Sequence, residues 1–102
     1  DKIMATFTHD FATQWELEAH MKKDLDSFMA IKDKLIEAGL THSKHGVLAG
    51  QQGKFRHMGI MFFDSVEAFN ACIEIIRNAD WDAEIAKVNR FENYVIDVEV
   101  NA

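Results

Sequence analysis

The chain predicts a single α+β domain whose six elements follow one another as strand, helix, strand, strand, helix and strand. Apolar residues alternate in several short runs, as in half-buried strands, and two longer segments repeat them every three or four positions, as in helices. Glycines and short polar residues separate these segments. A length of 102 residues fits one domain with one core.

The first strand is predicted over residues 2–9, KIMATFTH. Successive side chains of a strand point to opposite sides, so Ile3, Ala5 and Phe7 fall on one face. The run is also rich in β-branched and aromatic residues, which strands favour. It therefore has the pattern of a strand with at least one buried face.

The first helix is predicted to begin at Thr13, because Glu16 follows three residues later and completes a capping box. Its end is predicted at Gly39, since glycine enters the left-handed conformation without strain. One helix of this length has about 25 residues and is roughly 37 Å long, so a break at residues 24–27 is the alternative. The apolar residues expected to form its buried side are Leu17, Met21, Leu25, Phe28, Ile31 and Leu35.

The second strand is predicted over residues 40–50, LTHSKHGVLAG, and the third over residues 55–63, FRHMGIMFF, with a glycine-containing hairpin loop between them. The third strand does not alternate in the usual way. It is apolar at positions 58, 60 and 62 and again at 61 and 63, so both of its faces are apolar. A strand with one face in water would carry polar residues on that face.

The second helix is predicted to follow Asp64 as its N-cap, with Glu67 three residues later, and to end at residues 78–80. Residues 81–89 then form either a short extra helix or an ordered loop. The last strand is predicted over residues 93–100, NYVIDVEV. Its apolar face would consist of Tyr94, Ile96, Val98 and Val100.

Elements in this order predict the split βαβ, or ferredoxin-like, arrangement, in which two helices pack on one face of a four-stranded antiparallel sheet. The apolar character of residues 58–63 on both sides predicts that the second face of the sheet is covered as well. The simplest cover is a second copy of the chain, sheet against sheet. The alternatives are that a few exposed apolar residues are tolerated, or that the segment around Trp81 folds over them.

Composition argues against several classes of function. The 11 Lys and Arg residues against 17 Asp and Glu give a net charge of −6, which disfavours a nucleic-acid partner and an anionic membrane surface. No apolar run reaches the roughly 18 residues of a membrane span. Cys72 is the only cysteine, so it is expected as a small core residue rather than in an intramolecular disulfide. We expect a cytoplasmic protein, with a removed signal peptide as the alternative.

The order of elements and three local patches resemble the dimeric α+β barrel superfamily. The patches are MFFDSVEAFNACI at residues 61–73, EAGLTHSKHGVL at residues 37–48, and YVIDVEV at residues 94–100 with the acidic, tryptophan-containing segment before it. The resemblance implies two ferredoxin-like subunits that pair their sheets into a barrel, in an EthD-like or antibiotic-monooxygenase-like branch. Members of the superfamily include cofactor-independent monooxygenases, polyketide cyclases, small-molecule isomerases and haem-handling proteins. The catalytic residues of no single branch match this chain position by position.

The five histidines are the main chemical resource of the chain. His57 is predicted to act as general base or polar anchor of a pocket, with His9 as its rival, because imidazole titrates at a pKa of about 6.5. His42 and His45 are three residues apart on a strand, so they should point to opposite faces. His20 lies beside two lysines on the first helix, where a solvated face is expected.

The leading hypothesis is a homodimer that binds a small, largely apolar organic molecule in a pocket of each subunit. Conversion of that molecule by a monooxygenase-, cyclase- or isomerase-type reaction without a cofactor is an extension of this hypothesis. The predicted pocket walls are Trp15, Met61, Phe63 and Trp81, and Arg56 would supply charge for an anionic ligand.

Two other functions stay open: a non-enzymatic binding or stress-related module, and a haem- or metal-binding protein. We expect no metal and no cofactor, because the sequence has no HxH or HExxH pair. It also lacks a local cluster of histidines and carboxylates with recognisable spacing.

Overall fold

A computed structural model describes residues 1–50, 53–79 and 89–101 of the chain. Trp81 and the rest of residues 80–88, where an extra helix or loop is expected, lie outside the described residues. The order of elements confirms the predicted ferredoxin-like fold. The elements are β1 (Ile3–Phe11), α1 (Gln14–Ala38), β2 (Leu40–Val47), β3 (Phe55–Phe63), α2 (Val66–Asn78) and β4 (Arg90–Val95).

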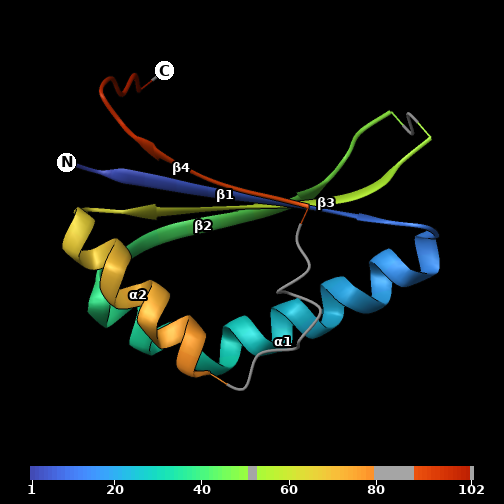
Figure 1. Ribbon diagram of the computed structural model, residues 1–102, viewed down its shortest axis with the longest axis horizontal. Helices are drawn as coiled ribbons and strands as arrows, with labels where there is room; N and C mark the ends of the chain where they lie inside the picture. Colours follow the sequence, from blue (N-terminus) through green and yellow to red (C-terminus); the bar gives the residue numbers. More distant parts are fainter. Residues whose placement is uncertain (51–52, 80–88, 102) are drawn as a thin grey trace.

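The four strands form one antiparallel sheet in the order β2-β3-β1-β4. The central strands β1 and β3 pair along their whole length, from Ile3 opposite Phe63 to Phe11 opposite Phe55. Both helices lie on one side of the sheet, and no described helix or strand lies over the middle of the other side (Figure 1). The side that faces the helices is called the inner face below, and the opposite side is called the outer face.

The main core fills the space between the inner face, α2 and the C-terminal half of α1. Its buried apolar residues are Ile3, Ala5, Leu35, Leu40, Met61, Phe63, Ala68 and Cys72. Phe63 packs edge-to-face against Phe69 of α2, with ring centroids 5.4 Å apart. The thiol of Cys72 is fully buried and donates to the carbonyl of Leu35 at 3.4 Å. The expectation of a small core cysteine is therefore confirmed.

Helix α1 runs unbroken for 25 residues, so the alternative of a break at residues 24–27 is wrong. Thr13 caps it as predicted, because its Oγ1 accepts a hydrogen bond from the backbone N–H of Glu16 at 3.1 Å. Asp24 begins no second helix, since its side chain is buried against the sheet instead. Among the described residues, neither helix is long and apolar enough to cross a membrane.

The buried side of α1 differs from the predicted one. Leu17 and Leu35 are buried as expected, but Leu25 is 56% exposed. His20 and Asp24, each only 4% exposed, face the sheet in that part of the helix. The positions 17, 20, 24, 28, 31 and 35 are also three or four apart, so this stripe satisfies the helical repeat with two polar members.

Gly39 ends α1 in the left-handed conformation with φ of 118°, as predicted. A Cβ atom at this position would overlap the Cβ of Ala68 in α2. The glycine therefore serves two purposes: it turns the chain from α1 into β2, and it allows the end of α1 to approach α2 closely.

Helix α2 has Ser65, and not the predicted Asp64, as its N-cap. The Oγ of Ser65 accepts a hydrogen bond from the backbone N–H of Ala68 at 3.0 Å. The reason lies in the backbone, because Ser65 is the extended residue directly before the helix and its short side chain reaches the first turn. Asp64 lies one residue too early to do so.

Strand β4 covers Arg90–Val95 and not the predicted residues 93–100. It pairs with β1 from Thr8, opposite the first residue of β4, to Ile3, opposite the last. The ladder ends where β1 begins, and one more backbone hydrogen bond, from the N–H of Ile96 to the carbonyl of Lys2 at 2.9 Å, follows it. Residues 97–100 are accordingly exposed.

The outer face carries the second apolar set of β3. Met58 is 42% exposed, and Ile60 and Phe62 are half-buried. Phe62 stacks on His42 of β2, with ring centroids 4.2 Å apart and planes inclined by 9°. The described chain beyond β4 and the connected ends of β2 and β3 rise on this side of the sheet (Figure 1).

Candidate functional site

Four of the five histidines gather at one end of the inner face. His9 lies on β1, His20 on α1, His45 on β2 and His57 on β3; together they are called the histidine cluster. Their rings form a chain, with centroid separations of 4.8 Å from His9 to His20, 5.7 Å on to His57 and 5.4 Å on to His45. His42 stacks on the outer face instead, so the predicted opposite orientation of His42 and His45 is confirmed.

The register of the strands brings three of these histidines together. His9 lies directly opposite His57 in the β1–β3 pair. In the β2–β3 pair Val47 is opposite His57, so His45 occupies the diagonal position two residues away on the same face. Side chains at opposite and diagonal positions are close enough to interact. The fourth histidine, His20, comes from α1, which packs on the inner face.

His57 is the buried centre of the cluster. Its side chain is 1% exposed, and burial, followed by the positive charges of His45, His20 and His9, lowers the pKa of His57 to about 4. The ring is therefore neutral at neutral pH. Its Nε2 lies 3.3 Å from Nδ1 of His45, while its own buried Nδ1 has no hydrogen-bond partner among the described residues. The edge of Phe7 closes one side, with ring centroids 5.5 Å apart.

The carboxylate of Asp24 approaches the same nitrogen of His45. Its Oδ2 lies 3.7 Å from Nδ1 of His45. Burial raises the pKa of Asp24, and the positive charge of His45 opposes that rise. Of the three residues Asp24, His45 and His57, only His45 reaches the surface, with 29% of its side chain exposed. Their metal-ligating atoms all lie within 4.8 Å of one another.

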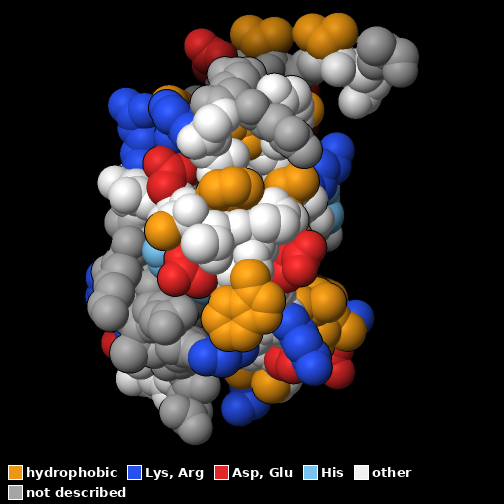
Figure 2. All heavy atoms as spheres, turned by 90° about the vertical axis from the view of Figure 1, so that its right-hand side faces the viewer, with side chains coloured by type: hydrophobic (Ala, Val, Ile, Leu, Met, Phe, Trp, Pro, Cys, Tyr) orange, Lys and Arg blue, Asp and Glu red, His pale blue; other side chains and the backbone are white. Residues whose placement is uncertain are grey.

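A hollow of about 430 Å³ adjoins the other end of the histidine cluster. It lies between the end of β1 and the first turns of α1, and its lining residues are His9, Phe11, Trp15, Glu16, Ala19, His20 and Lys23. His9 and His20 are buried, whereas Trp15 is 76% exposed. The Phe11 ring packs against both imidazoles, with its centroid 4.2 Å from that of His9 and 4.7 Å from that of His20. Figure 2 views this end of the molecule, where hydrophobic, acidic and basic side chains are interspersed.

The residues predicted to form a pocket are not all in one place. His9 and Trp15 line the hollow, and His57 lies behind it, where its ring is near that of His20. Met61 and Phe63, predicted as pocket walls, belong to the main core instead. Their inward direction follows the predicted strand parity, but the helices fill the space in front of them with side chains.

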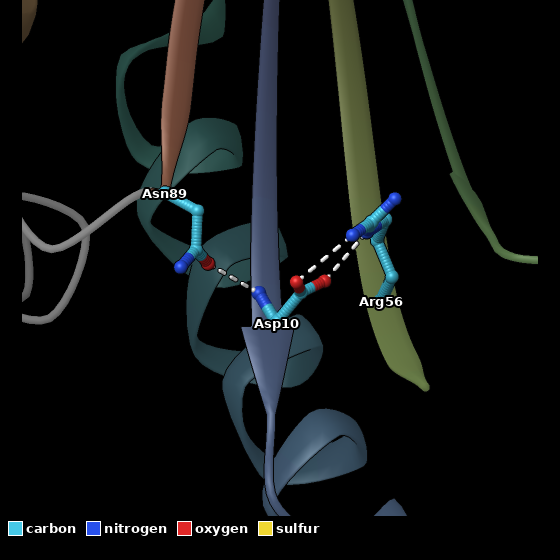
Figure 3. Close-up of polar contacts among 3 residues, drawn as sticks. All are labelled: Asp10, Arg56 and Asn89. Carbon is cyan, nitrogen blue, oxygen red and sulfur yellow. Dashed lines mark hydrogen bonds and ion pairs between the residues drawn. The ribbon is translucent and has the colours of Figure 1, made fainter. Parts of the chain in front are cut away.

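Arg56, the predicted charge for an anionic ligand, is paired within the chain. Its Nε and Nη2 donate to the two carboxylate oxygens of Asp10 at 2.6 and 2.9 Å (Figure 3). The backbone N–H of Asp10 in turn donates to Oδ1 of Asn89 at 2.6 Å. The hydrogen bonds from Arg56 are the main reason that the pKa of Asp10 is lowered. An anion at Arg56 would have to compete with this bidentate pair.

Two residues of this region, His20 and Asp24, were not predicted as inward-facing. The expectation that His20 lies on a solvated face is wrong, because its ring packs against His9 and Phe11. Lys22 and Lys23 favour a solvated face, and Lys23 does line the hollow beside His20, but the imidazole of His20 itself is buried. The usable signal is the spacing from Leu17, which places positions 20 and 24 on the same buried stripe.

Known proteins resemble this chain in fold. No protein-family model and no curated protein matches the chain. A solved dimeric ferredoxin-like protein from an uncultured marine organism superposes with a TM-score of 0.85 over 97% of this chain and 98% of its own, at 13% identity. A second dimeric ferredoxin-like protein from an uncultured marine organism gives a TM-score of 0.73 at 20% identity, covering 99% and 93% of the two chains. At these identities the likeness establishes the ferredoxin-like fold.

Proposed function

We propose that this chain is a homodimeric protein that binds a small, partly apolar organic molecule in the hollow beside the histidine cluster. The observation that carries the proposal is the convergence of aromatic, imidazole and ammonium groups on one hollow of about 430 Å³. A cavity of this size, apolar on one side and with a few polar groups, has the character of a small-molecule site.

The lining groups favour a ligand with a flat apolar body and an acidic group. Phe11 and Trp15 offer aromatic surface, and a bound ring would cover much of the exposed indole of Trp15. Lys23 adds a positive charge, and the imidazoles of His9 and His20 add hydrogen-bonding nitrogens. The Glu16 carboxylate already accepts from the backbone N–H of Ala12 at 3.2 Å. Small aromatic carboxylates are the ligand class with this complementarity.

The same geometry favours His9 over His57 as the polar anchor. His9 lines the hollow, whereas His57 is not among its lining residues and lies with its ring centroid 5.7 Å from that of His20. A pKa of about 4 also makes His57 a weak base at neutral pH. Conversion of a bound molecule without a cofactor would therefore start at His9 or His20, with His57 acting only through its neighbour.

Trp15 provides a direct reporter of binding at the hollow. The chain has two tryptophans, so Trp81→Phe leaves Trp15 as the single emitter. We expect a panel of small aromatic carboxylates to contain members that shift its emission saturably to shorter wavelength, because the indole leaves water on binding. In the same background His9→Gln should weaken binding about tenfold or more, since a hydrogen bond to a charged group contributes about 1.5–3 kcal/mol.

His42→Gln is the matched control for that titration. It removes an imidazole from the outer face and should leave the binding curve unchanged. The hollow is not a ligand site for this class if no member of the panel gives a saturable shift. Equal weakening by the two substitutions would likewise contradict the assignment of His9.

The outer face supports the homodimer. Met58, Ile60 and Phe62 present apolar surface there, and the helices cover only the opposite side. Burying such a patch against its own copy gives a twofold, self-complementary interface. The two ferredoxin-like proteins compared above are dimeric, which supports a dimer for this chain.

Charge placed in the outer face should dissociate the dimer. We expect the wild-type chain to have the mass of two subunits in light scattering at micromolar concentration, and Met58→Lys with Phe62→Lys to have the mass of one with unchanged far-ultraviolet circular dichroism. The control is Leu25→Lys on the exposed side of α1, which should remain dimeric. A monomeric wild-type chain, or dissociation by the control alone, would contradict pairing through this face.

A further inference from the structure

We propose that Asp24, His45 and His57 form a binding site for a divalent first-row transition-metal ion of the zinc or iron(II) type. The three residues come from α1, β2 and β3, and the fold holds their ligating atoms within 4.8 Å of one another. None of them lines the hollow, so the metal site stands whether or not the hollow binds a ligand.

Two of the three separations between the donor atoms are close to those around a bound ion. Zinc bonds imidazole nitrogen at about 2.0–2.1 Å and carboxylate oxygen at about 2.0–2.2 Å. Tetrahedral ligands at these lengths are about 3.3–3.5 Å apart. Nδ1 of His45 lies 3.3 Å from Nε2 of His57 and 3.7 Å from Oδ2 of Asp24. All three atoms lie within 4.8 Å of one another, so the remaining gap between Asp24 and His57 would close by up to about 1.5 Å when an ion binds.

Hydrogen bonds within the group cannot satisfy all three of these atoms at once. Nδ1 of His45 carries at most one hydrogen, so it cannot donate to Asp24 and His57 at the same time. Asp24 and His57 are buried, and a buried carboxylate needs a cation or several donors to offset its desolvation. A metal ion accepts a lone pair from each of the three atoms at once.

The surroundings of the three residues suit a metal site with an access path. The rings of Phe7 and Phe28 lie 6.0 and 6.1 Å from that of His45, which gives it apolar walls. The exposed part of the His45 side chain gives an ion a route from solvent. Two imidazoles and one carboxylate are a donor set used by zinc and non-haem iron, and they leave further coordination positions open.

The site can be tested with cobalt(II) and zinc(II) on chelator-treated full-length protein. We expect one Co²⁺ per chain, with the visible absorption of a four- or five-coordinate ion, and displacement of that ion by Zn²⁺. His45→Gln and Asp24→Asn should each weaken Co²⁺ binding by about tenfold or more, since loss even of a supporting group of a metal site costs about ten- to a hundredfold. His42→Gln, on the same strand but the opposite face, should bind as the wild type does.

A second readout does not require the variants to fold. Paramagnetic Co²⁺ should broaden the imidazole resonances of His45 and His57 in the wild-type protein and spare that of His42. The proposal is overturned if Co²⁺ does not bind stoichiometrically, if folded His45→Gln retains wild-type affinity, or if His42 is broadened as strongly as His45. In those cases the three residues form a hydrogen-bonded group only.

Discussion

Gly39→Ala is expected to lower the free energy of unfolding by about 3 kcal/mol. Its φ of 118° lies outside the conformations that an L side chain favours, at a cost of about 1–2 kcal/mol. The new methyl group would also overlap the Cβ of Ala68. Alanine has no rotamer to change, so α2 itself has to move, and such overpacking typically costs about 1–3 kcal/mol.

Gly53→Ala is the control that measures the cost of a positive φ without the cost of steric overlap. Gly53 also has a positive φ, of 72°, but apart from its chain neighbours no atom of the described residues lies within 4 Å of the position of an added Cβ. Urea denaturation should therefore show a loss of only about 1 kcal/mol for this variant. Equal losses in the two variants would mean that the contact of Gly39 with Ala68 does not set the spacing of the helices.

Acidification is expected to remove about 3 kcal/mol of stability through His57 alone, in metal-free protein. The pKa of His57 is about 6.5 in the unfolded chain and about 4 in the folded one. Between these values the unfolded chain binds more protons, so stability rises with pH. The contribution is fully present above a pH of about 6.5 and is lost as the pH falls towards about 4.

The measurement is the free energy of unfolding across this pH range, at constant protein concentration and with a chelator present. His57→Gln cannot titrate, so its stability should depend on pH much less steeply than that of the wild type. His42→Gln keeps the buried imidazole and should retain the wild-type slope. A wild-type slope in His57→Gln would show that other groups carry the pH dependence.

The fold follows from local signals in the sequence. The capping box at Thr13, the glycine at position 39 and the alternation of β1 and β3 each specify a backbone conformation within a few residues. The predicted positions differ from the structure at the ends of elements. The end of β4 depends on where β1 begins, and the N-cap of α2 depends on which of two adjacent polar residues has the extended backbone.

The candidate site is predictable only in part. Strand parity places His9 and His57 on the inner face, and the register needed to add His45 depends on the pairing of β2 with β3. The burial of His20 and Asp24 does not follow from an apolar repeat, because both are polar residues on the buried side of α1. Their burial depends on partners on three strands, His9, His45 and His57, and a single helical segment contains no information about these partners.

The ligand site can be examined most directly by nuclear magnetic resonance of ¹⁵N-labelled protein titrated with small aromatic carboxylates. We expect the chemical-shift changes to concentrate on the residues that line the hollow, including the indole N–H of Trp15 and the amide of Ala19, and to weaken in His9→Gln. Shift changes confined to the outer face, or none at the hollow with any member of the panel, would contradict small-molecule binding beside the histidine cluster.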